Sequence, residues 1–129
     1  MVSSRSSLAP CCRPLDHERL DAYQVAVALD ALVVRVAREA PRGHGWLADL
    51  AQRASGSSVL NLAESTGREG ADRARCLRIS RGEALEVDAA LPLLEHRGAC
   101  PPSVRAEARA LSVRLGAMLT RLIQRAAGR

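Results

Sequence analysis

The stretch of sequence that decides the fold is residues 50–86, which read LAQRASGSSVLNLAESTGREGADRARCLRISRGEALE. On both sides of a short segment with Gly67 and Gly70, apolar and small residues recur at spacings of three, four and seven. These spacings are typical of amphipathic helices, and glycine supports the positive φ that helix ends often need. The stretch therefore predicts two helices that fold back on one another as an antiparallel hairpin.

The first hairpin helix contains residues that favour a helix poorly, Gly56 above all, within the run Ser55–Ser58. Glycine in a helix interior costs about 1 kcal/mol relative to alanine, so contacts with another helix must keep this run helical. Folding the chain back brings Ala54–Ser58 opposite Arg78–Gly82, and we expect close backbone packing against Gly82. The alternative is a loop at Ser55–Ser58, which is disfavoured because no Ser-x-x-Glu capping box restarts a helix there.

Two polar residues, Asn61 and Glu64, lie on the apolar face of the same helix near its C-terminus. The helix dipole disfavours a carboxylate there, so we expect both residues to hydrogen-bond to neighbouring helices, with Arg75 or Arg78 beside Glu64. A catalytic Glu64 is the alternative, although no His or Cys stands at a spacing that completes an acid–base pair. The residues expected to have a structural role are Asn61, Glu64, Gly82 and Glu86.

Length and composition predict a single helical domain. The 129 residues suffice for one core, and 47% of them are hydrophobic, yet the only aromatic side chains are Tyr23 and Trp46. A core built from aliphatic side chains favours helices over sheets. The lack of aromatic residues also counts against modules that stack bases on aromatic rings.

The remaining sequence completes a four-helix bundle over residues 15–127, preceded by a disordered tail over residues 1–14. The predicted helices span residues 16–39, 45–65, 71–97 and 103–126. Pro92 is expected to kink the third helix rather than end it at Leu91, and Ser103 is the expected cap of the last. The predicted fold class is an all-α, antiparallel up-and-down bundle.

The first helix is apolar almost all round. From Val25 to Ala37, only Asp30 and Arg35 interrupt a run of Val, Ala and Leu. One core needs an apolar stripe only about 100° wide, so a second face should also be buried. We expect this face, with Val27 and Val34, to lie under neighbouring helices or, as the all-round pattern favours, in the interface of a homo-oligomer.

The charge is unevenly distributed along the chain. Residues 1–100 hold 13 Arg and 13 acidic residues, whereas residues 101–129 hold six Arg and Glu107, so the formal net charge of +5 lies at the C-terminal end. This pattern fits either a solvated helix face or a surface that contacts nucleic-acid phosphates without reading bases. The candidate nucleic-acid contacts are Arg105, Arg109, Arg114, Arg121 and Arg125, reinforced by Arg68, Arg75 and Arg78, with Arg73 and Arg81 nearby.

Cysteine and hydropathy patterns predict a reduced, cytoplasmic protein without a metal or another cofactor. Cys11 and Cys12 are adjacent, Cys76 and Cys100 stand alone, and no Cys-x-x-Cys or zinc-type His spacing occurs. The sequence shows no signal peptide and no apolar run of about 20 residues that could cross a membrane.

Several of these motifs resemble one known family, the four-helix-bundle proteins first met as open reading frames in intervening sequences of large-subunit ribosomal RNA. The resemblance covers Leu20 to about Ile123 and is most specific in an Asn-x-Ala-Glu signature followed by Gly-Arg. The residues that carry it are Tyr23-Gln24, Gln52-Arg53-Ala54, the run Ser58–Glu64, Gly67-Arg68, the run Leu77–Gly82 and Glu86. The chain departs from the family's preferred residues at Ser65, Cys76, Ser80 and Glu83.

The resemblance implies a partner as well as a fold. The family includes accessory proteins of diversity-generating retroelements, which form pentameric barrels and bind nucleic acid beside a reverse transcriptase. By this resemblance we expect a ring-shaped homopentamer that offers Arg to RNA or DNA, as an accessory to a reverse transcriptase or to a ribosomal-RNA intervening sequence.

No enzyme motif competes with that expectation. A di-iron bundle needs Glu-x-x-His pairs, whereas the chain has Glu83-x-x-Glu86 without such a His, and it has no phosphate loop, nucleophile elbow or His-Glu-x-x-His motif. We therefore expect a noncatalytic protein. The alternative is an oligomeric protein–protein scaffold without a nucleic-acid role, and an enzyme ranks third.

Overall fold

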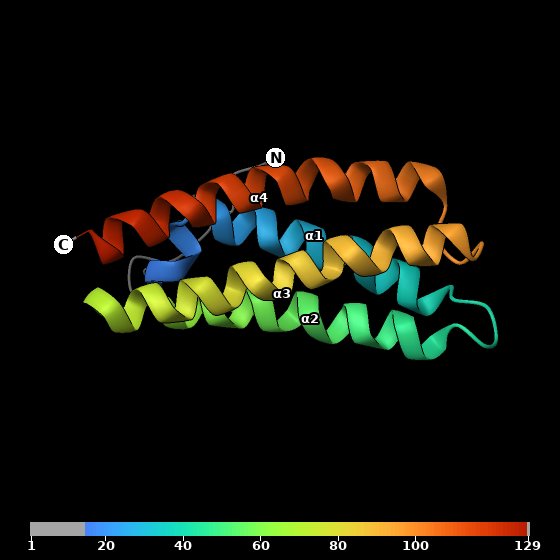
Figure 1. The fold of residues 1–129 in the computed structure, drawn as a ribbon, viewed down its shortest axis with the longest axis horizontal. Helices are drawn as coiled ribbons and strands as arrows, with labels where there is room; N and C mark the ends of the chain where they lie inside the picture. Colours follow the sequence, from blue (N-terminus) through green and yellow to red (C-terminus); the bar gives the residue numbers. More distant parts are fainter. Residues whose placement is uncertain (1–14, 129) are drawn as a thin grey trace, which may run out of the picture.

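The computed structural model describes residues 15–128, which form one 3-10 helix and four α-helices (Figure 1). The elements are η2 (Asp16–Arg19), α1 (Asp21–Arg38), α2 (Gly45–Ser65), α3 (Gly70–His96) and α4 (Pro102–Ala127). No strand occurs among the described residues. The prediction of an all-α protein with four helices is confirmed, whereas the tail predicted over residues 1–14 lies outside the described part of the chain.

Each helix packs against two others, and a single core lies between the four. α1 contacts α2 and α4, and α3 contacts the same two helices, whereas α1 and α3 are not neighbours. Figure 1 shows the helices side by side along the long axis, with the start of α3 and the end of α4 at one end of the molecule. The largest fully buried side chains are aliphatic, as the composition predicts: Leu29, Leu62, Leu77, Leu94, Leu115 and Leu119.

The chain enters the bundle through a turn, so the prediction of one helix from residue 16 is wrong. Asp16–Arg19 form the 3-10 turn η2, and α1 begins only after Leu20, which is extended with φ −81° and ψ 128°. Glu18 stabilises the turn, because its Oε1 accepts a hydrogen bond from the N–H of Leu15 at 2.7 Å and its carbonyl oxygen accepts one from Gln24 Nε2 at 3.2 Å. Such local bonds compete with the helical ladder.

α2 is continuous, so the run Ser55–Ser58 is helical, as predicted. The predicted cause is wrong, because Gly56 and Gly82 both have open space where a Cβ would lie. Two serines, Ser58 and Ser80, hold the helices together instead. Ser58 Oγ donates to the carbonyl oxygen of Ser80 at 2.9 Å, and Ser80 Oγ donates to that of Ser58 at 2.7 Å. Because each short side chain reaches the other backbone, α2 and α3 lie close together here.

α3 passes through Pro92 without ending. The alternative in which the helix ends at Leu91 is wrong, because α3 runs to His96 and Leu94 beyond the proline is fully buried. Burial of Leu94 offsets the backbone hydrogen bond that proline cannot donate. A kink at Pro92 stays a prediction.

α4 begins one residue earlier than predicted. Its first residue is Pro102 and its N-cap is Pro101, so the predicted cap by Ser103 is wrong. Proline suits the first turn of a helix, because an N–H at that position has no helical acceptor.

The outer face of α1 is partly covered by the bundle itself. The side chains that face the core are Ala22, Val25, Ala26, Leu29, Leu32, Val33 and Val36. On the outer side Val27 is 40% exposed and Val34 is half-buried. Contact of this face with a second subunit stays a prediction. Even α1 lacks the length and apolar character to cross a membrane, as do the other helices of residues 15–128.

Candidate nucleic-acid interface

The basic residues predicted as one strip on α4 fall on two sides of the helix. Arg105 and Arg109 line a hollow between α4 and α3. Arg121 and Arg125 line a different hollow, between α4 and the start of α1. Arg114 follows Arg105 by nine positions, about two and a half turns, so it lies on the opposite side from Arg105. The prediction that the five Arg residues share one surface is therefore wrong.

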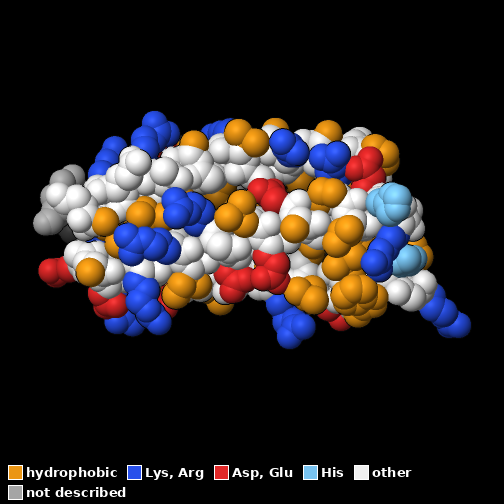
Figure 2. All heavy atoms as spheres, viewed as in Figure 1, with side chains coloured by type: hydrophobic (Ala, Val, Ile, Leu, Met, Phe, Trp, Pro, Cys, Tyr) orange, Lys and Arg blue, Asp and Glu red, His pale blue; other side chains and the backbone are white. Residues whose placement is uncertain are grey.

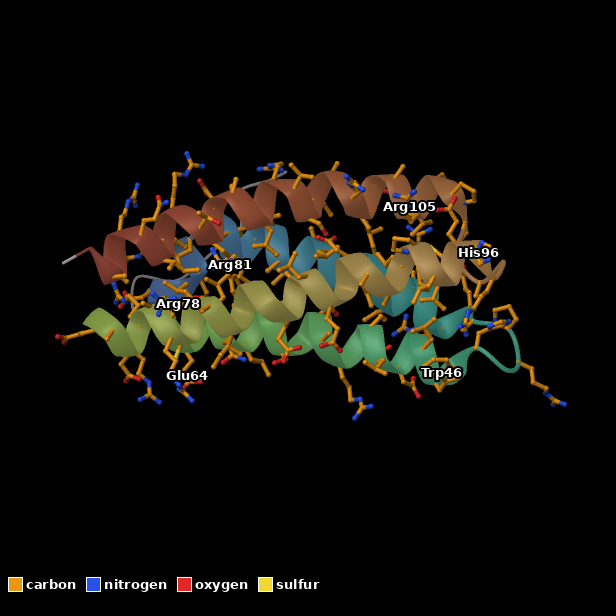
Figure 3. All side chains as sticks on the ribbon, in the orientation of Figure 1. Trp46, Glu64, Arg78, Arg81, His96 and Arg105 are labelled. Carbon is orange, nitrogen blue, oxygen red and sulfur yellow. The ribbon has the colours of Figure 1, made fainter. Side chains whose placement is uncertain are left out.

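Arg105 joins two helices. Its Nε donates to Glu95 Oε1 at 2.6 Å, and the two side chains are only 32% and 29% exposed. Figure 3 shows Arg105 near the start of α4, beside the end of α3. Because its charge is compensated and largely enclosed, we assign Arg105 to the α3–α4 contact and not to a phosphate.

Arg68 is also compensated by carboxylates. Its Nη2 donates to Glu64 Oε2 at 2.6 Å and its Nη1 to Asp72 Oδ2 at 3.0 Å across the turn between α2 and α3. The hydrogen bond to Glu64, followed by that to Asp72, raises the pKa of Arg68. Glu64 is thus paired as predicted, but neither Arg75 nor Arg78 is its partner. Both Arg68 and Glu64 are exposed, so the pair contributes little to stability.

Asn61 acts within its own helix. Its Nδ2 donates to the carbonyl oxygen of Ser57 at 2.9 Å and to Ser57 Oγ at 3.1 Å. Ser57 Oγ in turn donates to Glu83 Oε2 of α3 at 3.0 Å. The prediction that Asn61 and Glu64 bond directly to neighbouring helices is wrong, and Ser57 makes the link. The predicted structural residue Glu86 is exposed and has no polar partner among the described residues.

Arg73 completes the C-terminus of α2, a role that the sequence reading missed. Its Nε donates to the carbonyl oxygen of Ser65 at 2.9 Å and its Nη2 to that of Thr66 at 3.2 Å. The last carbonyl oxygens of a helix have no N–H donor within it, so a basic side chain often donates to them. The position of Arg73 just beyond the predicted helix stop was the available signal.

Asp30 provides a second polar link that the sequence reading missed. Ser55 Oγ donates to Asp30 Oδ1 at 2.5 Å and so connects α2 to α1. Ser55 is buried and Asp30 is half-buried. The interruption of the apolar run of α1 by Asp30 was the signal that such a partner existed.

Five Arg residues, three on α3 and two on α4, lie toward the end of the bundle where α3 begins and α4 finishes. We call them the basic end: Arg75, Arg78, Arg81, Arg121 and Arg125. Within residues 15–128 none of them forms an ion pair, and Arg81 Nη1 donates to Thr120 Oγ1 at 3.2 Å between α3 and α4. Figure 2 shows basic side chains gathered toward this end, and Figure 3 places Arg78 and Arg81 there. Arg109 and Arg114 lie nearer the middle of α4.

Thiols and metal ligands are the remaining reactive groups. Cys76 and Cys100 are buried and free, and burial raises the pKa of the Cys100 thiol. Nearby Glu95 acts in the same direction and Arg105 in the opposite one. Among residues 15–128 no group of three His, Cys, Asp or Glu side chains could hold a metal ion. Cys11 and Cys12 lie outside the described residues.

These features define the class as an all-helical, four-helix protein with an Arg-rich end. Residues 18–121 match the sequence profile of the 23S rRNA-intervening sequence protein family. The chain belongs to this family, which confirms the resemblance seen in its motifs. A comparison with curated proteins finds no match.

Proposed function

We propose that this protein is a noncatalytic, up-and-down four-helix bundle that assembles as a ring-shaped homo-oligomer and binds RNA or DNA through its basic end. The observation that carries the proposal is the gathering of Arg75, Arg78, Arg81, Arg121 and Arg125 without a carboxylate partner among the described residues. Uncompensated Arg side chains bind phosphate well, because a guanidinium offers a planar fork of donors. The membership in a family named for a ribosomal-RNA intervening sequence supports a nucleic acid as the partner.

Assembly matters because one basic end is small. Five phosphate contacts alone give weak binding at physiological salt. A ring repeats the basic end on every subunit, and linked sites can raise the overall affinity by roughly 10² to 10⁴ without new contacts. A pentamer, the state that the family resemblance implies, would carry five copies. Binding should therefore tolerate any base sequence, weaken steeply with salt and require the oligomer.

The biological setting follows from the family rather than from the site. An accessory role beside a reverse transcriptase and a role linked to a ribosomal-RNA intervening sequence, both in the cytoplasm, are the two settings we propose. Finding a reverse-transcriptase gene beside this one would favour the first setting, and finding this gene inside a ribosomal RNA gene would favour the second.

The test compares two triple variants with the same change of charge. Changing Arg78, Arg121 and Arg125 to Gln removes contacts at the basic end. The control changes Arg35, Arg38 and Arg53 to Gln, which are exposed residues of α1 and α2 outside the basic end. Affinity for a short RNA and a short DNA duplex is measured as a function of salt.

We expect the basic-end variant to bind every nucleic acid more weakly and to flatten the salt dependence by about one unit of slope per lost phosphate contact. The control should keep most of the slope. Helix content should match the parent in both variants. The proposal would be contradicted if the parent protein bound no nucleic acid at low salt, or if the two triple variants bound nucleic acid equally tightly. Either result would favour the scaffold alternative.

A further inference from the structure

A hollow of about 640 Å³ opens at the same end of the bundle as the basic end. It lies among η2, the turn between α2 and α3, and the last turns of α4, which Figure 1 shows together at one end of the molecule. Its apolar lining is aliphatic and consists of Leu20, Leu77, Leu122 and Ala126. Small-molecule sites are mostly apolar cavities of about 300 to 1,000 Å³ with a few polar groups. We call this site the end hollow, and its volume suffices for a nucleobase.

Two carboxylates and two guanidinium groups complete the lining of the end hollow. Asp16 comes from η2 and Glu69 is the residue that caps the start of α3. Both side chains are exposed, and neither forms an ion pair within the part of the chain that the structure describes. Arg73 is occupied by the carbonyl oxygens that end α2, whereas Arg125 is one of the uncompensated residues of the basic end. Hydrogen-bond acceptors and a phosphate-binding side chain therefore border the same hollow.

Arg125 connects the end hollow to the rest of the basic end. It also lines the neighbouring hollow of about 230 Å³ between α4 and the start of α1, together with Arg121 and Leu122. A phosphate held by Arg121 and Arg125 therefore lies beside the mouth of the end hollow. In an unpaired strand the base next to such a phosphate is free to turn away from the backbone into an apolar site.

The carboxylates determine which group can enter. A phosphate inside the end hollow would be repelled by the like charges of Asp16 and Glu69. A neutral base avoids this repulsion, and a carboxylate oxygen accepts a hydrogen bond from an amino group of the base. Adenine, cytosine and guanine carry such an amino group. Uracil and thymine instead present two carbonyl oxygens, which a carboxylate repels.

We propose that the end hollow takes one unpaired, amino-bearing base of a nucleic acid whose phosphates lie on Arg121 and Arg125. The base packs against the aliphatic lining, and its amino group donates to Asp16 or Glu69. In a duplex the amino groups of the Watson–Crick edge are engaged in base pairs, so duplex binding stays insensitive to sequence. The inference rests on the proposed function and adds to it a preference for adenine, cytosine or guanine at an unpaired end.

The test uses one RNA duplex in five forms, one blunt and four with a single unpaired 5′ nucleotide that carries adenine, cytosine, guanine or uracil. The uracil form is the reference, because it has the same number of phosphates as the other three overhang forms. We expect the three amino-bearing overhangs to bind about two- to tenfold more tightly than the uracil overhang, the gain from one hydrogen bond.

A variant with Asp16→Asn and Glu69→Gln tests the two carboxylates. Amide side chains donate as well as accept, so uracil should gain a partner and the preference should fall below about twofold. The matched control carries Asp49→Asn and Glu86→Gln, which remove the same two charges at exposed positions of α2 and α3 outside the end hollow. It should keep the full preference. Comparing overhangs within each variant cancels the general gain in phosphate affinity that follows the loss of two carboxylates.

The fluorescent base 2-aminopurine, which also carries an amino group, reports the position of the overhang directly. Stacking on a neighbouring base quenches its emission, and the apolar lining of the end hollow contains no aromatic ring. The emission of a 2-aminopurine overhang should therefore rise when the parent protein binds. The same base placed inside the duplex should show no rise.

Failure of this inference is distinct from failure of the proposed function. Equal affinity for the uracil and amino-bearing overhangs, with the blunt duplex still bound, would overturn the inference and leave the proposed function intact. A full preference in the Asp16→Asn, Glu69→Gln variant, or no rise in 2-aminopurine emission, would overturn the inference as well. A parent protein that binds none of the five duplexes at low salt would contradict the proposed function itself.

Discussion

At the scale of single residues, the serine pair of α2 and α3 shows how small polar side chains can decide helix packing. Ser58 and Ser80 are almost wholly buried, and each donates to the backbone of the other helix. A buried donor without a partner is costly, so the reciprocal bonds also satisfy both hydroxyl groups. The pair therefore fixes both the distance between the helices and their register.

The pair gives a prediction about stability. Ser80→Ala loses a buried hydrogen bond and should cost about 1 kcal/mol, whereas Ser80→Leu forces the helices apart and should cost about 1 to 3 kcal/mol. Urea unfolding followed by circular dichroism measures both values. Ser103→Ala, at an exposed position of α4, is the control and should stay within about 0.5 kcal/mol of the parent. A tolerated Ser80→Leu would contradict a close approach of the backbones.

A second prediction concerns the thiol of Cys100. Burial raises its pKa, so the folded protein holds this proton more strongly than the unfolded chain does. The stability linked to this proton is fully present below the unfolded pKa and is lost as pH rises through the higher folded pKa. Stability should fall on the alkaline side, and Cys100 should alkylate more slowly in the folded protein than in urea. Peptide mass spectrometry after a timed iodoacetamide reaction measures this; equal rates in both states would refute it.

At the scale of the helices, the sequence was sufficient to predict a helical segment where the local apolar pattern and the burial in the fold agree. The helical run Ser55–Ser58 was predictable because its neighbours carry a continuous apolar face and no restart signal occurs. The start of α1 was not predictable, because Asp16–Arg19 resemble a helix start in sequence but form a turn. Local hydrogen bonds of Glu18 stabilise this turn. Acidic residues support both structures, and only the three-dimensional contacts distinguish them.

The candidate site was predictable in composition but not in geometry. The Arg content of α4 is visible in the sequence, and the spacing from Arg105 to Arg114 could have revealed two sides of the helix. The ion pair of Arg105 with Glu95 could not be foreseen, because the two residues lie on different helices, on either side of the connection at Pro101. Which Arg residues are free therefore depends on tertiary contacts.

The glycines of the hairpin provide a prediction at this scale. Gly56 and Gly82 have no atom within 4 Å of an added Cβ, so alanine should fit at either position. Gly56→Ala and Gly82→Ala should each stabilise the protein by about 1 kcal/mol, because alanine favours a helix more than glycine does. Gly98→Ala is the contrasting change and should destabilise, since Gly98 has a φ of 76°. Thermal melting curves measure these changes. A loss of stability in Gly82→Ala would contradict the open space at Gly82 and support the close backbone packing expected from the sequence.

At the scale of the whole molecule, the basic end and the acidic residues of the second half of α3 lie apart along the bundle axis. The basic end lies where α3 begins and α4 finishes, whereas the second half of α3 carries Glu83, Glu86, Asp88 and Glu95 without a basic residue among them. In a ring made by one rotation, every basic end faces the same rim. Such a rim would act as a continuous track for a phosphate backbone, and its field would fade within about 8 Å at physiological salt.

The placement of the single tryptophan determines which optical signals can report on this protein. Trp46 is 57% exposed, stacks against the guanidinium of Arg97 at 5.5 Å and lies at the opposite end of the molecule from Arg78 (Figure 3). An indole already in water changes its emission little when the chain unfolds, so fluorescence is a poor measure of folding here. A partner that covers Trp46 would shift the emission to shorter wavelength, whereas phosphate bound at the distant basic end would leave it unchanged.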